Sequence, residues 1–498
     1  MNNLLASTSF LVSGILLYLI SRRYASKSST IPGPSAHPLV GHTLQVPTKK
    51  TWKYFEKLSH QFGPIVKVSL AGDDIILARR SRNYSSRRPL VYAGKYRSDN
   101  LRLALLPYGD TLKKYRAAFH QMLQPRAVGG YEGMQYTESL RLLADLVGAP
   151  EEYYHHFLRF PASLVFTLSY GQRINDEGKD LADVQRIFTT FVEDLTPGAH
   201  LVDTFPILDW LPDFLSPWRA EAKEKHQHEL ELYSRLALEV KARMEQDIGL
   251  ECFAARLWDQ QVKLNLTDKE IFYVAGTAFS TGTDTSVTTL LWFIMAMALY
   301  PATMKKAQQE IDSIFNSHTL PVFTRMQDLP YCFALVKEVL RWAPTVPLGI
   351  PHYADADDEY NGYKIRKGTT VISSLWNMHH NEDEYPNSYT FDPERFLSTR
   401  PGKAAVDDSL ADGHYGFGFG RRRCPGQHMA MKSTWIAVVR VLWAFDIERR
   451  KDASGNLMRV DPNLCTSGLT SRPQEFPVDF VPRSATHIET IMSGQGNI

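Results

Sequence analysis

The stretch FGFGRRRCPG, residues 417–426, places Cys424 among three glycines, three arginines and a proline. Cysteine binds a metal as the thiolate, and the positive charge of the adjacent arginines favours that form. The glycines let the backbone approach a flat ligand closely. Cys424 also stands just ahead of a predicted helix, whose N-terminal dipole favours negative charge. The stretch therefore predicts a cysteine prepared for a specific chemical role.

Taken alone, this stretch leaves two interpretations open. In the first, Cys424 is the single thiolate ligand of a metal whose other ligands come from elsewhere, and heme with an axial cysteine fits that pattern. In the second, Cys424 is a free redox-sensing cysteine in a basic loop. The other cysteines, Cys252, Cys332 and Cys465, form no CxxC pair with it or with one another. A structural zinc site is therefore not expected.

Two charged patterns lie upstream of the cysteine stretch. In VKEVLRW (336–342), Glu338 and Arg341 are three residues apart on one face of a predicted helix and can pair. FDPERF (391–396) offers a second Glu–Arg combination in a proline-bounded turn, from which Arg395 could join the first pair. Such pairs usually lie on solvated faces, so they carry weight only through their order along the chain.

The composition indicates a large globular protein. The chain has 498 residues, 44% of them hydrophobic, and a net charge of +2, so no nucleic-acid partner is expected. We expect a mainly α fold with a small β region built from both ends of the chain. Strand-like patterns occupy 65–70, 76–79 and 369–375, and helical patterns occupy 106–123, 183–195, 216–246, 268–300 and 432–448.

The N-terminus predicts a membrane anchor. Leu4–Ile20 carries no charge and is followed by Arg22, Arg23 and Lys27, and a spanning helix needs roughly 17–25 residues. Basic residues on the C-terminal side favour a single-pass anchor with the body on the cytoplasmic side. We expect an anchor at 1–22, a basic and proline-rich hinge at 23–42, and one catalytic domain at 43–498. A buried N-terminal helix is the alternative.

In this order, the motifs resemble those of the cytochrome P450 family of heme-thiolate monooxygenases. FGFGRRRCPG matches the family signature FxxGxRxCxG at each fixed position, and Glu338 and Arg341 match its ExxR pair. PERF (393–396) is similar to its PERF turn, and TGTDTS (281–286) to its oxygen-activation segment. The resemblance runs from about residue 31, where IPGP is similar to the family's proline hinge, to about residue 485. It implies the cytochrome P450 fold, with a single large heme-binding domain.

The resemblance assigns a heme site residue by residue. Cys424 would be the axial iron ligand, whose electron donation favours O–O cleavage. Phe417 would pack beside the thiolate, Gly426 would belong to the cofactor-binding loop, and Arg422 would bind a heme propionate.

Two more residues are carried over to the heme propionates. His352 occupies a position where the family often has a second propionate partner. Arg116 corresponds to the arginine of the family's WxxxR helix, although Leu112 replaces the tryptophan. Ordinary structural roles are the alternative for both residues.

Asp284 and Thr285 are the predicted catalytic residues. A hydroxyl beside a carboxylate, at a break among small residues in an otherwise apolar helix, can hold a proton relay. The alternative is that Thr285 bonds back to a helix carbonyl and only bends the helix. Thr281 departs from the small apolar residue usual in this family and could alter the pocket.

The resemblance also places a substrate pocket and its partners. The pocket is mostly apolar and fits a hydrophobic small molecule such as a terpenoid; packing in the core is the alternative for its members. The segment 202–218 is rich in aromatic and aliphatic residues and could contact membrane lipid. The predicted substrate residues are Leu101, Leu103, Phe191, Phe279, Thr281, Val346, Leu348, Leu469 and Thr470.

No phosphate-binding glycine motif opens a βα unit, so the electrons must come from another protein. The resemblance implies NADPH–cytochrome P450 reductase, with cytochrome b5 as a second possible donor, at the endoplasmic reticulum membrane. A basic face of Lys113, Lys114, Arg421, Arg423 and Lys432 could bind an acidic reductase, although a solvated charged face is the plain alternative.

Three functions remain open beside terpenoid hydroxylation in fungal secondary metabolism. The substrate could be an aromatic or polyketide metabolite, the reaction could be a heme-thiolate rearrangement or dehydration without oxygen insertion, or the chain could be a heme sensor. Retention of Asp284 and Thr285 argues against the last two, because neither needs a proton relay. The chain departs from the family pattern between residues 76 and 90. This segment is too short for the helix that the family usually has there.

Overall fold

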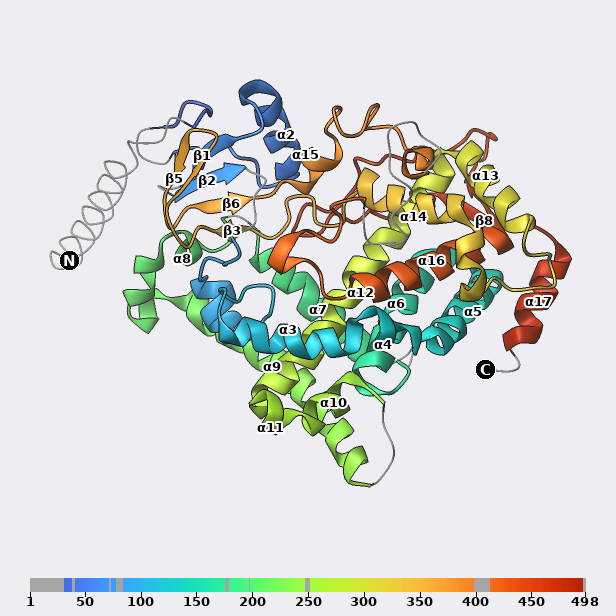
Figure 1. Ribbon diagram of the computed structural model, residues 1–498, viewed down its shortest axis with the longest axis horizontal. Helices are drawn as coiled ribbons and strands as arrows, with labels where there is room; N and C mark the ends of the chain where they lie inside the picture. Colours follow the sequence, from blue (N-terminus) through green and yellow to red (C-terminus); the bar gives the residue numbers. More distant parts are fainter. Residues whose placement is uncertain are drawn as a thin grey trace.

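The structure is a computed structural model that describes residues 31–37, 41–70, 73–77, 84–174, 179–196, 198–246, 251–397 and 413–495. The predicted anchor at 1–22 and much of the hinge at 23–42 lie outside these residues. The described part is mainly helical with three small sheets (Figure 1), so the predicted fold class is confirmed in this respect.

The helices dominate the part of the chain between residues 110 and 342. The longer ones are α2 (Thr51–Phe62), α3 (Asp110–Leu123), α5 (Glu132–Gly148), α6 (Tyr153–Tyr170), α7 (Lys179–Asp194), α9 (Pro217–Glu245), α12 (Asp268–Leu299), α13 (Pro301–Asp312), α14 (Pro330–Trp342), α16 (Gln427–Ala444) and α17 (Ala485–Gln495). The shorter ones are α4 (Pro125–Gly129), α8 (Leu201–Thr204), α10 (Phe253–Asp259), α11 (Gln261–Leu264) and α15 (Leu375–His379).

The largest sheet joins distant parts of the chain, in the order β1-β2-β6-β3. Strands β1 (Val66–Leu70) and β2 (Asp73–Leu77) overlap the predicted strands at 65–70 and 76–79 and pair antiparallel, and β6 (Thr370–Ile372) pairs parallel with β2. Strand β3 (His352–Tyr353) completes the sheet. Two antiparallel pairs, β4 (Asp358–Tyr360) with β5 (Tyr363–Ile365) and β7 (Phe445–Arg449) with β8 (Val478–Pro482), form the other sheets.

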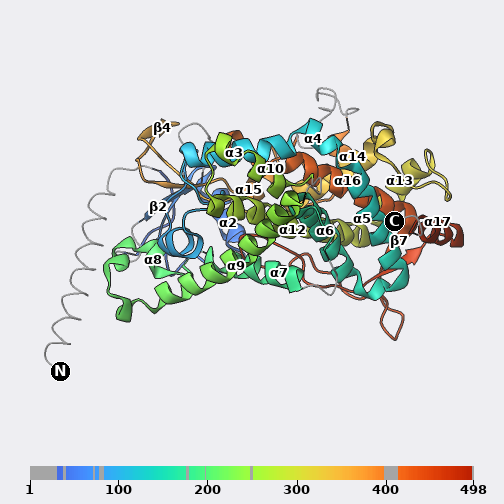
Figure 2. The same ribbon diagram turned by 90° about the horizontal axis from the view of Figure 1, so that it is seen from below.

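Helix α12 runs through the middle of the molecule (Figures 1 and 2). Its start is fixed by a capping box, in which the Thr267 and Glu270 side chains each bond the other's backbone N–H. Although α12 is long and apolar enough to cross a membrane, most of it is buried inside the protein. The helix is continuous from Asp268 to Leu299, close to the predicted range 268–300, and the predicted interruption lies in its apolar pattern and not in its backbone. Each of the small polar side chains there bonds a carbonyl four residues back, which leaves the helix intact.

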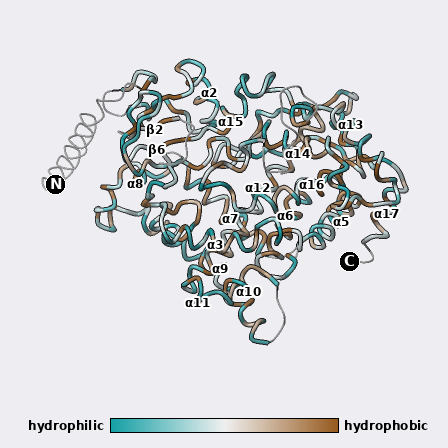
Figure 3. Tube along the Cα trace, in the orientation of Figure 1, coloured by the Kyte–Doolittle hydropathy of each residue, from teal (hydrophilic) through white to brown (hydrophobic). Residues whose placement is uncertain are grey.

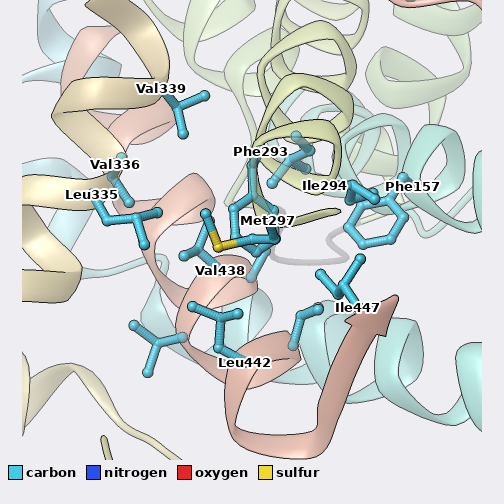
Figure 4. Packing of buried hydrophobic residues seen from close by; sticks show 14 of the residues in the cluster. Phe157, Phe293, Ile294, Met297, Leu335, Val336, Val339, Val438, Leu442 and Ile447 are labelled. Carbon is cyan, nitrogen blue, oxygen red and sulfur yellow. The ribbon is translucent and has the colours of Figure 1, made fainter. Parts of the chain in front are cut away.

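The main hydrophobic core packs α12 against α6, α14, α16 and the antiparallel strands β7 and β8. Figure 4 shows Met297 of α12 beside Val438 of α16, and Ile294 of α12 beside Phe157 of α6. Along the outer surface, the trace in Figure 3 mixes hydrophilic and hydrophobic residues, as half-solvated helices require. Helix α16 ends at Ala444, earlier than predicted, because Phe445–Arg449 pairs as strand β7.

A buried ionic triad holds α14 and the segments that pack against it in place. The Glu338 carboxylate accepts hydrogen bonds from Arg341 Nε at 2.7 Å and from Arg395 Nε at 3.1 Å. Arg341 also donates to the carbonyls of His379 and Ser388, at 2.8 and 2.7 Å. All three charged side chains are at most 2% exposed. The triad therefore ties the PERF turn and the 379–390 segment to α14.

We expect Glu338→Gln to destabilise the protein by about 3–5 kcal/mol, because it leaves two buried arginines without a counter-charge. Urea unfolding followed by circular dichroism would measure the change. Lys305→Ala is the matched control, since it removes an exposed pair with Asp446 and should cost at most about 1 kcal/mol. Equal costs for the two variants would contradict a structural role for the triad.

Candidate active site

The loop around Cys424 is held in shape by its own backbone. The Cys424 N–H donates to the Phe417 carbonyl at 2.9 Å, and the Gly418 N–H donates to the Tyr415 carbonyl at 2.8 Å. Gly418 and Gly420 have φ angles of 69° and 63°, in the left-handed region that favours glycine. The Phe417 ring packs partly against the main core. The loop thus presents Cys424 on a rigid turn directly before α16.

This loop is also joined to the ionic triad. The Tyr415 N–H donates to His379 Nε2 at 2.8 Å, and the carbonyl of the same histidine accepts from Arg341. His379 is fully buried, which lowers its pKa and keeps the ring neutral. A neutral ring can accept this bond at one nitrogen. The triad therefore positions the cysteine loop through a single histidine.

Cys424 is solvent-accessible, yet burial by the surrounding protein raises the pKa of its thiol. Arg116, Arg423 and the Gly426 N–H act in the opposite direction but do not outweigh burial. The expectation that the adjacent charges alone would favour the thiolate is therefore not met. A thiol that is accessible but enclosed suits metal ligation, because a bound metal ion deprotonates it outright.

Four donor side chains gather near this loop. Arg422 donates to the carbonyls of Ser85 and Leu106, both at 2.6 Å, and Arg116 donates to the Arg423 carbonyl at 3.1 Å. His352 bonds the Tyr84 carbonyl. The fourth is Arg87, a residue that sequence reasoning missed.

Arg87 is only 7% exposed and donates to the carbonyls of Ala104, Ile350 and Pro351. Its only sequence signal was a basic pair, Arg87–Arg88, within the shortened 76–90 region. That pattern does not distinguish a buried arginine from a solvated one.

These side chains repel one another. Burial and then Arg422 lower the pKa of Arg87 to about 9, and burial and then Arg116 lower the pKa of Arg422 to about 10. Burial and then Arg87 lower the pKa of His352 to about 3. In the described ranges no carboxylate lies at ion-pair distance from Arg87 or Arg422. Asp355 acts on Arg422 from farther away and does not outweigh burial, which lowers the pKa of Arg422. Cations that are buried or half-buried with so little counter-charge are costly, so this cluster is suited to an anionic ligand.

The cluster and the cysteine fit heme. A heme carries two propionates, which Arg87, Arg116, Arg422 and His352 are placed to bind, and Cys424 would supply the axial thiolate. Gly418 adds to this fit, because a side chain built there would meet no atom within 4 Å. The loop therefore leaves open space beside the cysteine.

The middle of α12 carries the predicted catalytic residues. Several residues in the middle of this helix keep exposed surface between mostly buried stretches: Ala278, Thr281, Gly282, Asp284, Thr285 and Ser286. The Thr285 hydroxyl donates to the Thr281 carbonyl at 2.9 Å, so the bond back to a helix carbonyl that we considered as the alternative is present. Its oxygen still has lone pairs to accept a further hydrogen bond. Asp284 pairs with Arg472, at 3.3 Å between Oδ1 and Nη1.

Three of the segments that carry predicted substrate residues meet around this helix and the cationic cluster. Ser471 donates to the Thr345 carbonyl at 2.9 Å, and Thr345 contacts Thr289 of α12. The 101–106 segment bonds Arg422 through the Leu106 carbonyl. Leu101, Leu103, Thr281, Val346, Leu348 and Leu469 are partly exposed, whereas Phe191, Phe279 and Thr470 are buried. Phe279 packs on Phe166 and Tyr170 of α6, and its contact with substrate stays a prediction.

A buried ionic network, which the sequence did not reveal, fastens the 91–105 segment over this region. Arg97 pairs with Asp194 of α7 at 3.4 Å, and Arg102 pairs with Glu229 of α9 at 2.7 Å. The Arg102 guanidinium lies 3.8 Å from the centre of the Phe191 ring. The network therefore fixes Phe191 and the segment that carries Leu101 and Leu103.

Comparison with known proteins agrees with this geometry. The family model for cytochrome P450 matches residues 31–473, and the chain belongs to that family. Its members use heme with a cysteine thiolate ligand and NADPH-derived electrons delivered by a reductase. The chain is accordingly an oxidoreductase of the monooxygenase type.

Curated relatives with this similarity are fungal. Cytochrome P450 monooxygenase 231 of Postia placenta is 31% identical, with 98% of this chain and 95% of that protein aligned. Cytochrome P450 monooxygenase fogE of Aspergillus ruber is 34% identical, over 91% of this chain and 87% of that protein. Cytochrome P450 monooxygenase claR of Ampulloclitocybe clavipes is 33% identical, over 98% and 93%. The first alignment spans 541 residues, more than the 498 of this chain, so that relative has residues without a counterpart here.

We expect Arg87→Ala to weaken heme retention about tenfold or more, because a hydrogen bond to a charged group contributes about 1.5–3 kcal/mol. The rate of heme transfer to an excess of a heme-scavenging apoprotein would measure it. Arg421→Ala is the control, since Arg421 is exposed and contacts the Tyr108 ring. Identical transfer rates for the two variants would remove Arg87 from the anion site.

Proposed function

We propose that this monooxygenase hydroxylates a hydrophobic small molecule of terpenoid type in fungal secondary metabolism. The observation that supports the proposal is that segments with partly exposed apolar side chains meet near α12, through the bonds from Thr345 to Thr289 and from Ser471 to Thr345. Leu101, Leu103, Val346, Leu348 and Leu469 come from three segments and include no charged group. Such a surface favours an apolar ligand that is fixed by few polar contacts.

Bound heme supplies the activation of dioxygen, with electrons from NADPH through the partner reductase. The chain's own residues perform three tasks around it. Cys424 supplies the thiolate, and the cluster of Arg87, Arg116, Arg422 and His352 holds the negative charge of the propionates. Asp284 and Thr285 hold and pass on protons at the middle of α12, where the Thr285 oxygen accepts a hydrogen bond.

We further propose that the protein acts at the endoplasmic reticulum membrane, with the catalytic domain on the cytoplasmic side. The segment between α7 and α9 supports a second lipid contact besides the predicted anchor. Leu201, Trp210 and Phe214 are 65%, 86% and 83% exposed, although all three are strongly apolar. An exposed apolar group of this kind fits the interface of a bilayer.

Electron delivery would use the face around Arg421, with the reductase and optionally cytochrome b5 as donors. The lysines of the predicted basic face are already paired, Lys113 with Asp110, Lys114 with Glu270 and Lys432 with Glu132. Arg421 is exposed and has no ion pair among the described residues. The attraction for an acidic partner is therefore weaker than the count of basic residues suggests.

The experiment is co-expression of the full chain with NADPH–cytochrome P450 reductase, followed by incubation of microsomes with terpene, aromatic and polyketide skeletons under isotopically labelled dioxygen. Mass spectrometry should find a terpenoid product that carries one labelled oxygen atom. A product formed without label would favour the rearrangement or dehydration alternative. Labelled products from aromatic or polyketide compounds alone would contradict the terpenoid assignment.

Thr285→Ala should lower product per NADPH about tenfold and raise peroxide release, because a positioned proton donor typically contributes 100-fold or more. Thr283→Ala is the matched control. Its hydroxyl also donates to a carbonyl four residues back, that of Phe279, but the side chain is buried on another face of α12. Unchanged coupling in Thr285→Ala would remove Thr285 from the proton relay.

A further inference from the structure

The ion pair between Asp284 and Arg472 joins the middle of α12 to a turn near the C-terminus. We name residues 466–472 the C-terminal turn. The Arg472 Nη1 atom lies 3.3 Å from Asp284 Oδ1, and the two side chains are 24% and 15% exposed. The pair therefore stands where the buried face of α12 meets solvent.

The backbone of the C-terminal turn is fixed from both of its ends. The Thr466 N–H donates to the Arg472 carbonyl at 2.8 Å, and the Arg472 N–H donates to the Thr466 hydroxyl at 2.9 Å. Trp292 of α12 donates its ring N–H to the Ser471 carbonyl at 2.8 Å, inside the core. Because Trp292 lies about two helical turns beyond Asp284, the turn is attached to the same helix that it reaches with Arg472. The guanidinium is thus aimed at Asp284 by an anchored backbone.

One carboxylate oxygen of Asp284 lies buried outside the ion pair. Burial raises the pKa of Asp284, and Arg472 and the Thr470 side chain oppose that shift. Tyr154 of α6 is another titratable group beside the pair; its ring centre lies 6.0 Å from the Arg472 guanidinium, and burial, with contributions from Asp284 and Glu475, raises its pKa. Within the part of the chain that the structure describes, Asp284 Oδ2 is buried and meets no donor at hydrogen-bond distance and angle. Arg472 therefore engages Oδ1, and the Thr470 side chain is the other polar group beside the carboxylate.

We propose that Arg472 is a positioning residue for Asp284, and that the C-terminal turn links substrate contact to proton delivery. This inference rests on the proposed function, in which Asp284 belongs to the proton relay. Arg472 holds Oδ1 and so directs Oδ2 as the oxygen that binds and releases a proton. The proton resides on the buried Oδ2 and leaves toward the Thr285 side of the helix, and the carboxylate that remains takes up a new proton from water at the exposed edge of the ion pair. Arg472 keeps its charge throughout.

The same turn carries two of the predicted substrate contacts, Leu469 and Thr470. A molecule that presses on these residues therefore touches the segment that sets the position of Arg472. A substrate bound here would act on the orientation of Asp284 without touching the carboxylate. None of the motifs in the sequence contains Arg472, so this link is visible only in the folded chain.

The first test uses thermal unfolding of the heme-loaded full chain between pH 4 and 8. Because the pKa of Asp284 is raised in the folded state, its contribution to stability is lost as pH rises through that pKa. Arg472→Ala should raise the pKa further and enlarge the fall in midpoint temperature with rising pH, whereas Arg472→Lys should not. Asp284→Asn and the double variant should lack this component. Arg450→Ala, which removes a half-exposed pair with Asp479, is the matched control and should not change the pH dependence.

The second test measures peroxide released per NADPH, with the panel compound of highest turnover. Arg472→Ala should raise the peroxide fraction in the same direction as Asp284→Asn, with product per NADPH lowered about tenfold, and Arg472→Lys should restore most of it. If Arg472→Ala changes stability but not the peroxide fraction, or changes neither, the inference is overturned. If Asp284→Asn itself leaves coupling intact, the relay in the proposed function is wrong. That failure is recognised separately, because the stability cycle reports the ion pair without any turnover.

Discussion

The buried carboxylate of Glu338 is the constraint on which the site depends. It accepts hydrogen bonds from both Arg341 and Arg395, and Arg341 extends its bonds to the carbonyls of His379 and Ser388. From His379 a single bond leads to Tyr415, at the start of the loop that presents Cys424. A buried ion triad contributes little net stability compared with apolar packing. Its value here is geometric, since it fixes α14, the PERF turn and the cysteine loop relative to one another.

A second constraint is the charge imbalance beside that loop. Arg87 and Arg422 donate their hydrogen bonds to backbone carbonyls. Arg422 helps to lower the pKa of Arg87, and both arginines help to lower the pKa of His352. The cationic cluster and the accessible thiol lie at one place, so one ligand that is both anionic and metal-bearing satisfies both. The same physical argument explains why a cysteine with a raised pKa is compatible with thiolate ligation, because the metal supplies the missing stabilisation.

Local patterns predicted much of this arrangement. The spacing of Glu338 and Arg341 and the turn containing Arg395 led to the triad, and the composition around Cys424 led to the cysteine loop. Contacts between distant segments were outside the reach of such patterns. The role of Arg87 depends on its hydrogen bonds to carbonyls near residues 104 and 351. The role of Arg472 depends on its contact with a helix almost two hundred residues earlier in the chain. The small polar residues of α12 interrupt its apolar pattern, and their hydroxyls bond back to helix carbonyls, a detail that the sequence left open for Thr285.

We propose that Cys424 is the thiolate ligand of a heme held by this cationic cluster. The most direct test is the absorption spectrum of the purified, heme-loaded full chain, reduced under carbon monoxide, for the natural chain and for Cys424→Ser. We expect the red-shifted Soret band of thiolate-ligated heme in the natural chain and its loss in the variant. Persistence of that band in Cys424→Ser would show that Cys424 is not the ligand.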